Sequence, residues 1–168
     1  LKTSTFGTGV LIADALKRGA THIILTIGGS ATNDAGIGMA AALGWTFLDG
    51  EGATLDPVGE NMIRIASISA AKPASSSFTV VTDVENPLAG PAGAAHVFAA
   101  QKGANATIIK QLDKGLNNIA SFFGSMASEP GAGAAGGRLH CAPRPARQAA
   151  RQAAVLQARA AAGAAGAA

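Results

Sequence analysis

The chain has 168 residues, of which 48% are hydrophobic and 14% are charged. This length and composition predict one folded domain with its own core, and they exclude a disordered chain or two domains of ordinary size. The longest uncharged stretch, residues 86–101, is shorter than the roughly 18 apolar residues that a membrane span needs, so we expect no transmembrane helix. The single cysteine, Cys141, excludes a disulfide scaffold and a cysteine-based zinc cluster. We therefore expect a reducing, cytoplasmic setting.

The net charge of +3 is the sum of two unlike parts. Residues 1–137 contain eight Lys and Arg against ten Asp and Glu, which gives −2. Residues 138–168 contain five Arg and no acidic residue, which gives +5. The basic character belongs to the C-terminal segment, and this distribution excludes a uniformly basic nucleic-acid-binding domain.

The first part of the chain predicts a helix, a strand and a second helix. Apolar residues at helical spacing predict a helix over residues 9–18, with Thr8 as its N-cap and Gly19 at its end. Residues 21–27 form a β-branched run without alternation, which is typical of a parallel strand buried on both faces. Small residues predict a second helix over residues 35–43. This alternation favours an α/β fold.

The middle of the chain predicts two more strands. Residues 45–48 suit a short strand, and residues 49–52 supply turn residues after it. Residues 77–84 form a second strong strand, which cannot continue past Pro87. Residues 59–69 are compatible with either a helix or a strand.

Residues 107–123 are the clearest helix in the chain. Their large apolar residues lie three and four positions apart and form one stripe, which predicts a helix face packed in the core. The members of this stripe are Ile109, Leu112, Leu116, Ile119 and Phe123.

The character of the sequence changes after Gly137. Fourteen of the last 31 residues are alanine, and arginine is the only charged residue type. Such a segment can coil locally but lacks an apolar stripe with which to dock, so we expect a mobile tail. The alternative is a weak polyanion-binding arm.

The most informative segment is GGSATND, residues 28–34, because it follows a predicted strand. In open α/β sheets ligands bind beyond the carboxyl ends of the strands, and a strand–glycine loop–helix turn offers free backbone N–H groups to an anion. Two glycines allow close approach, three short polar side chains can bind a ligand, and an acid can orient a metal or a hydroxyl. These residues are Gly28 and Gly29, then Ser30, Thr32 and Asn33, and finally Asp34. A tight turn with a capping side chain is an equally good interpretation.

Two charged residues further along the chain are additional candidates. Asp83 lies near the carboxyl end of the second strong strand, so both strand ends face one crevice if the strands are parallel neighbours. There its carboxylate could act as a general base or hold Mg²⁺, although a solvated acid at a strand end is the more common situation. Lys102 offers a cation beside small residues, and it gains significance only together with the other candidates.

Other patterns argue against familiar sites. Residues 131–136 satisfy G-x-G-x-x-G, but no buried strand precedes them, so a dinucleotide site is not expected. The chain has no P-loop motif. Its histidines, His22, His96 and His140, lack the spacing of metal ligands.

Four segments, in order and spacing, resemble the bacterial glycerate kinase family, which phosphorylates D-glycerate with ATP. They are TSTFGTG at 3–9, ILTIGGSATNDAGIGMAAALG at 24–44, TDVENPLAGPAGAAHVFAAQKGA at 82–104 and PGAGAAGG at 130–137. The resemblance covers about residues 1–137. It identifies this part as a partial glycerate kinase-like α/β domain, and residues 138–168 as a separate Ala/Arg/Pro-rich tail.

The resemblance implies a fold, a reaction and a set of roles. The family fold has two unlike α/β domains with the active site between them, and this chain resembles a fragment made mostly of the inserted second domain. The implied reaction moves the γ-phosphoryl group of ATP to a hydroxyl of D-glycerate, at C2, with Mg²⁺ as cofactor. The residues that would cradle phosphate or the glycerate carboxylate are Gly28, Gly29, Ser30, Thr32 and Asn33. Asp34 and Asp83 would contact the metal or accept the hydroxyl proton, and Lys102 would pair with an anion.

Two departures from the family leave alternatives open. Family members are about twice this long, and residues 138–168 do not resemble them. We hypothesise that this segment results from a shifted reading frame or a misplaced gene end, which sequencing of the encoding DNA would decide. The alternatives to a truncated kinase are an inactive remnant that binds small anions and, less favoured, a nucleic-acid-associated protein that uses the arginine-rich tail.

Overall fold

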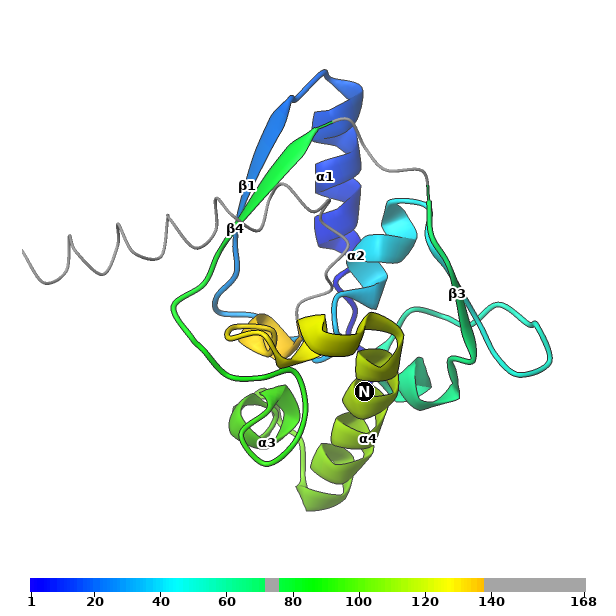
Figure 1. Cartoon of the computed structure of the whole chain (residues 1–168), viewed down its shortest axis with the longest axis vertical. Helices are drawn as coiled ribbons and strands as arrows, with labels where there is room; N and C mark the ends of the chain where they lie inside the picture. Colours follow the sequence, from blue (N-terminus) through cyan, green and yellow to red (C-terminus); the bar gives the residue numbers. More distant parts are fainter. Residues whose placement is uncertain (72–75, 138–168) are drawn as a thin grey trace, which may run out of the picture.

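The computed structural model describes residues 1–71 and 76–137. The predictions made for residues 138–168, which are a mobile tail, a polyanion-binding arm and a shifted reading frame, lie outside the described residues. The described part forms two packed regions joined through α2, as Figure 1 shows. One region holds α1 and the β1–β4 pair, and the other is built around α4.

Strands β1 (His22–Thr26) and β4 (Ser77–Val81) form a parallel pair in which Thr26 lies opposite Val81. The backbone N–H of Ile27 donates to the carbonyl of Val81 at 3.0 Å, so the pairing continues past the end of β1. The predicted parallel neighbours are confirmed. The predicted burial of both faces is wrong for the described residues, because Ile24 on the outer face of β1 is 65% exposed.

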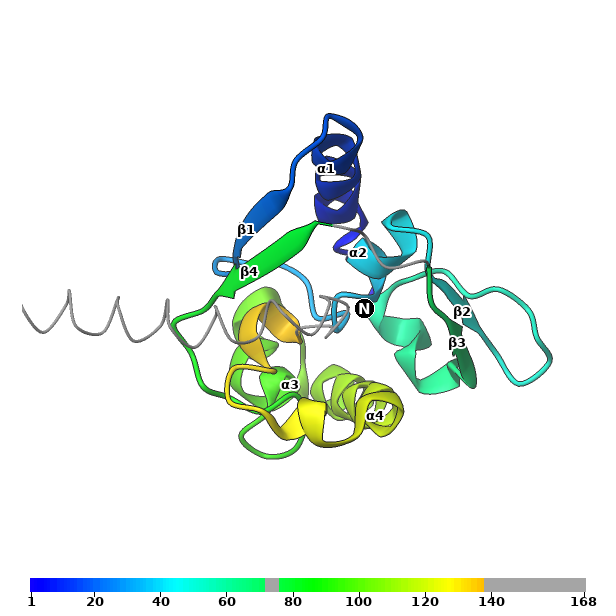
Figure 2. The ribbon, with the colours of Figure 1, turned by 45° about the horizontal axis from the view of Figure 1, so that its top comes forward.

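Helix α1 (Phe6–Lys17) begins earlier than predicted, with Thr5 rather than Thr8 at its N-cap. It crosses closely over α2 (Ile37–Ala42), which is the predicted small-residue helix in a shorter form. The crossing needs Gly9, because a Cβ there would overlap the backbone of Met39. Figure 2 shows α1 and α2 stacked beside the β1–β4 pair.

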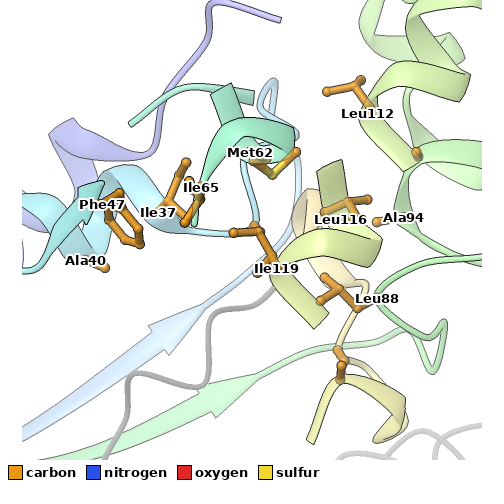
Figure 3. Packing of buried hydrophobic residues seen from close by; sticks show 14 of the residues in the cluster. Ile37, Ala40, Phe47, Met62, Ile65, Leu88, Ala94, Leu112, Leu116 and Ile119 are labelled. Atoms are coloured by element: carbon orange, nitrogen blue, oxygen red, sulfur yellow. The ribbon is translucent and has the colours of Figure 1, made fainter. Parts of the chain in front are cut away.

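The larger region packs around α4 (Ala106–Phe123), the helix predicted most clearly. Its stripe is confirmed: Leu112, Leu116 and Ile119 are buried, while the two end members are partly buried against the same cluster. Figure 3 shows Leu116 and Ile119 gathered with Met62, Ile37 and Leu88, which belong to the same buried cluster. The partners of α4 are the 3₁₀ helix η1 (Gly59–Arg64) and α3 (Ala94–Phe98).

The ambiguous segment 59–69 contains both of the structures that its sequence allowed. Helix η1 occupies its first half, and β3 (Ser67–Ser69) occupies its end, where it pairs antiparallel with β2 (Thr46–Leu48). The turn predicted at 49–52 is confirmed, since a carboxylate oxygen of Asp49 accepts from the N–H groups of Glu51 and Ala53.

Three short 3₁₀ helices complete the described elements. They are η2 (Ala100–Lys102), η3 (Gly124–Ser128) and η4 (Ala134–Gly136). No helix within residues 1–71 and 76–137 has the length and apolarity that crossing a membrane requires.

Candidate functional site

A pocket of about 320 Å³ lies between α1, the inner face of the β1–β4 pair and two glycine-rich loops. The N-terminal end of α1, the end of β1 and the loop after it contribute hydroxyl-bearing residues, namely Ser4, Thr5, Thr8, Thr26, Ser30 and Thr32. The body of α1, α2 and the sheet contribute large apolar residues, which include Ile12, Leu25, Met39, Leu43, Phe78 and Val80. A largely apolar cavity with a few converging polar groups is the usual form of a small-molecule site.

The predicted glycine loop forms one wall of this pocket. Gly28, Ser30 and Thr32 line it directly, whereas Gly29 and Asn33 do not. No hydrogen bond among the described residues uses the backbone N–H groups of residues 28–31, nor that of Asn33. Such unpaired amide donors can bind an anion.

The N-terminus of α1 adds donors on the side of the pocket formed by Thr5 and Thr8. The backbone N–H groups of Gly7 and Thr8 belong to the first turn and have no acceptor among the described residues. The first N–H groups of a helix lack intrahelical partners and carry its positive dipole end. Together with the glycine loop, this end of the pocket suits a negatively charged group.

A second glycine-rich segment, residues 133–137, closes the pocket and packs on the first. The hydroxyl of Ser30 donates to the carbonyl of Ala135 at 2.7 Å. Gly136 is required at its position, because it has a φ of +92° and a Cβ there would overlap the carbonyl oxygen of Thr32. Sequence reasoning gave this segment no role in a site, although its small residues resembled the family.

Asp34 is not in the pocket wall and is 1% exposed. Its Oδ2 accepts from the N–H and the hydroxyl of Thr5, at 2.7 and 2.8 Å, and from the N–H of Gly38 at 3.3 Å. Its Oδ1 accepts from the N–H of Gly36 at 3.2 Å. Asp34 therefore joins Thr5, the residue that precedes α1, to the start of α2 through one carboxylate. The metal or proton-transfer role predicted for it stays a prediction, and this geometry does not favour that role.

Asp83 is exposed and lies two residues beyond the end of β4. It therefore stands at the same sheet edge as Gly28, as the parallel pairing predicts, but it does not line the pocket. Its carboxylate makes no hydrogen bond or ion pair with the described residues. Asp83 is consequently the candidate acid that keeps its oxygens available for a ligand.

The described residues contain no cluster of three or more His, Cys, Asp or Glu side chains that could hold a metal. Asp34 does not fit Mg²⁺, because four donors already occupy its oxygens. Asp83 fits the role of a single carboxylate ligand, since Mg²⁺ often binds through one or two carboxylates together with substrate phosphates.

Lys102 lies at the end of η2 and reaches the glycine loop across 70 residues of sequence. Its Nζ donates to the carbonyl of Thr32 at 2.5 Å and to the hydroxyl of Ser30 at 3.4 Å. Half-burial of the side chain lowers the pKa of Lys102, and the nearby charge of Asp34 opposes that shift. Lys102 thus contacts the loop, but its side chain does not line the pocket, and the predicted pairing of Lys102 with an anion stays a prediction.

Asn33 is buried, and only half of its side-chain amide is satisfied. Its Nδ2 donates to the carbonyl of Ala94 at 3.4 Å, while its Oδ1 has no partner among the described residues. The predicted contact between Asn33 and a ligand remains untested, since the side chain does not line the pocket.

Comparison with known proteins identifies the family to which this α/β domain belongs. The model of the glycerate kinase family matches residues 1–160, and the chain belongs to that family. A glycerate kinase of Bacillus cereus is 45% identical over 146 residues, which cover 82% of this chain and 38% of that protein. The glycerate 2-kinase of Escherichia coli is 42% identical with the same coverage.

A solved structure agrees with the fold. The crystal structure of a protein described as glycerate kinase 2, from Salmonella typhimurium LT2, superposes with a TM-score of 0.77 at 42% identity. The superposition covers 82% of this chain and 39% of that one. The chain thus spans about 38% of the length of the curated relatives named above. The family-model match also runs past Gly137 to residue 160, where the sequence analysis found no resemblance.

Proposed function

We propose that the chain is the phosphate-binding part of an ATP-dependent glycerate kinase, which phosphorylates D-glycerate at its 2-hydroxyl. Within the family fold we assign it mostly to the inserted second α/β domain. The observation that carries the proposal is the loop after β1, where at least four consecutive unpaired amides adjoin a pocket that the N-terminus of α1 also faces. Family membership supplies the reaction.

Phosphoryl transfer requires positioning and charge neutralisation more than it requires a reactive protein nucleophile. In the proposed reaction an oxygen–phosphorus bond forms at the glycerate hydroxyl, the bond between the β- and γ-phosphates breaks, and ADP leaves. The loop amides, that of Ser30 among them, and the hydroxyl of Thr32 would hold the phosphate or the glycerate carboxylate, because the hydroxyl proton of Ser30 is already donated to the carbonyl of Ala135. Asp83 would accept the hydroxyl proton or contact the metal.

Mg²⁺, when bound with ATP, would neutralise phosphate charge. Among the residues considered as ligands, Asp83 has the free carboxylate that this requires, whereas Asp34 serves the two helix ends. The role of Asp83 therefore does not depend on Asp34, and substitutions can separate the two.

A second function is supported by one specific feature of the pocket. None of the residues that line it carries an acidic or basic side chain, so the wall offers binding groups but no proton acceptor. This favours, as the alternative, a chain that binds small anions without turnover. Calorimetry with ATP and with D-glycerate, beside a coupled ADP-release assay, distinguishes binding alone from catalysis.

The sharpest test uses two glycines that accept a methyl group equally well. A Cβ at Gly28 or at Gly50 meets no atom within 4 Å, and neither residue has a positive φ, so both substitutions preserve the fold. Gly28→Ala places its methyl group at the pocket wall and should weaken ATP or glycerate binding at least about tenfold, roughly 1.4 kcal/mol. Gly50→Ala, in the turn after β2, should leave binding unchanged. Equal affinities in the two variants would remove the loop from the site.

A further inference from the structure

Lys102 stands behind the glycine loop rather than in the pocket. Its two partners, Thr32 and Ser30, do line the pocket. We propose that Lys102 is a positioning residue, whose ammonium group fixes the loop in the conformation that leaves its amides free for an anion. Its role would then be to orient the anion-binding backbone and not to pair with the anion. The inference rests on the proposed function only for the identity of that anion.

The geometry of one peptide bond explains how a lysine can act in this way. A trans peptide is planar, so its C=O and N–H groups point in opposite directions. The carbonyl of Thr32 is directed at Lys102, and the N–H of Asn33 must therefore point away from that ammonium group. The N–H of Asn33 has no acceptor among the described residues. Rotation of this peptide would turn the carbonyl, an acceptor, towards the side that now presents a donor.

Other contacts hold the loop less directly. The hydroxyl of Ser30 accepts from the N–H of Thr32 at 3.2 Å and donates to the carbonyl of Ala135. These are neutral hydrogen bonds, whereas the bond from Lys102 has a charged donor and is about twice as strong. Without Lys102, the carbonyl of Thr32 would keep only the long, neutral hydrogen bond from the hydroxyl of Ser30, at 3.3 Å, and that hydroxyl already donates to Ala135 at the shorter distance of 2.7 Å. The charged donor is therefore the strongest contact that fixes the peptide between Thr32 and Asn33.

The test compares Lys102→Met with Lys110→Met. Methionine keeps much of the length of lysine and removes the donor, and Lys110 is an exposed lysine of α4 without a described partner. Backbone NMR order parameters of ligand-free chains should fall at residues 28–33 from about 0.85 to below about 0.6 in the Lys102 variant only. Inorganic pyrophosphate should bind that variant at least about tenfold more weakly. Unchanged loop order in Lys102→Met would overturn the proposal, whatever happens to pyrophosphate affinity.

The wild-type chain provides a second measurement that needs no stable variant. As pH rises and Lys102 loses its proton, the ¹³C resonance of the Thr32 carbonyl should shift with the same midpoint as the side chain of Lys102. Asp34 is the charged group that acts on Lys102 here. A Thr32 carbonyl that does not follow Lys102 would refute the contact. Neither NMR measurement involves ATP or glycerate, so failure of the proposed kinase function would leave both results interpretable.

Discussion

The α4 region and the β1–β4 region differ sharply in how firmly they are packed. Around α4, sixteen buried residues form one cluster, whereas only Ile12 and Phe78 are buried in the cluster beside the strand pair. The pocket lies in the less packed region. Ligand-binding segments are generally drawn from the less stable parts of a protein, so this region is where the proposed site is expected.

Exposed apolar side chains show the same difference. Seven large apolar residues are exposed among those described, and four of them belong to α1 and β1: Phe6, Val10, Leu11 and Ile24. Each contributes little to the stability of the described fold, because burial is what stabilises an apolar side chain. Replacing a buried apolar residue of the α4 region by alanine should therefore lower the free energy of unfolding much more than replacing an exposed apolar residue of α1 or β1.

The largest expected effect separates two leucines. Leu116 is fully buried in α4 and Leu11 is 73% exposed on α1. Leu116→Ala should lower the free energy of unfolding by about 3 kcal/mol, since it removes buried methyl groups and leaves a cavity. Leu11→Ala should lower it by less than about 0.5 kcal/mol. Urea unfolding of the two variants measures both values, and similar losses would contradict the contrast between the regions.

The next effect concerns Asp34, which ties α1 to the start of α2. Asp34→Ala leaves three backbone N–H groups and the hydroxyl of Thr5 without their acceptor, which should cost about 2–4 kcal/mol. Asp56→Ala is the control, because that side chain is exposed and has no described partner. Thermal unfolding followed by circular dichroism compares them. A stable Asp34 variant without activity would instead restore the catalytic role.

A substitution at Asp83 should lower turnover without lowering stability, whereas the substitution at Asp34 should lower stability. Asp83→Asn keeps the shape of an exposed side chain, so the free energy of unfolding should stay within about 0.5 kcal/mol of wild type. In a full-length relative that carries the same motif, turnover should fall at least about tenfold, roughly 1.4 kcal/mol of transition-state stabilisation. Steady-state kinetics with ATP and D-glycerate measures this, and a wild-type rate would exclude Asp83 from the mechanism.

Local sequence patterns predicted the helices and strands that are determined by residues close together in the sequence. The stripe from Ile109 to Phe123 required α4, and the β-branched runs required the two strands that pair. Burial of the outer face of β1 was predicted wrongly. A β-branched run indicates a strand whose two faces can both be buried, but it does not show that other described residues pack on both faces. Residues 59–69 divided into two elements because η1 packs on α4 while β3 pairs with β2.

The candidate site was predictable only in part, because its contacts join distant segments. The glycine loop was found from its place after a strand. Asp34 looked like a catalytic acid because its partner Thr5 lies 29 residues earlier and is not recognisable as one from the sequence. The segment 133–137 and the start of α1 entered the pocket by tertiary packing, for which sequence spacing gives no signal.

The smallest expected effect is a pH dependence that Lys102 gives to the looser region. Burial lowers the pKa of Lys102 in the folded chain, whereas in the unfolded chain it returns to its ordinary value of 10.5. Between these two values the unfolded chain binds more protons, so the contribution of Lys102 to the free energy of unfolding rises with pH. Below the folded pKa the destabilisation is fully present, and above 10.5 it is gone. Because the side chain is only partly buried, solvent screening keeps the effect small. Urea unfolding at pH 8 and pH 10 should show wild type gaining stability relative to Lys102→Met but not relative to Lys110→Met. If the difference in free energy of unfolding between wild type and Lys102→Met is the same at both pH values, burial does not destabilise the charged form of Lys102. The loop that Lys102 contacts would then be open to water.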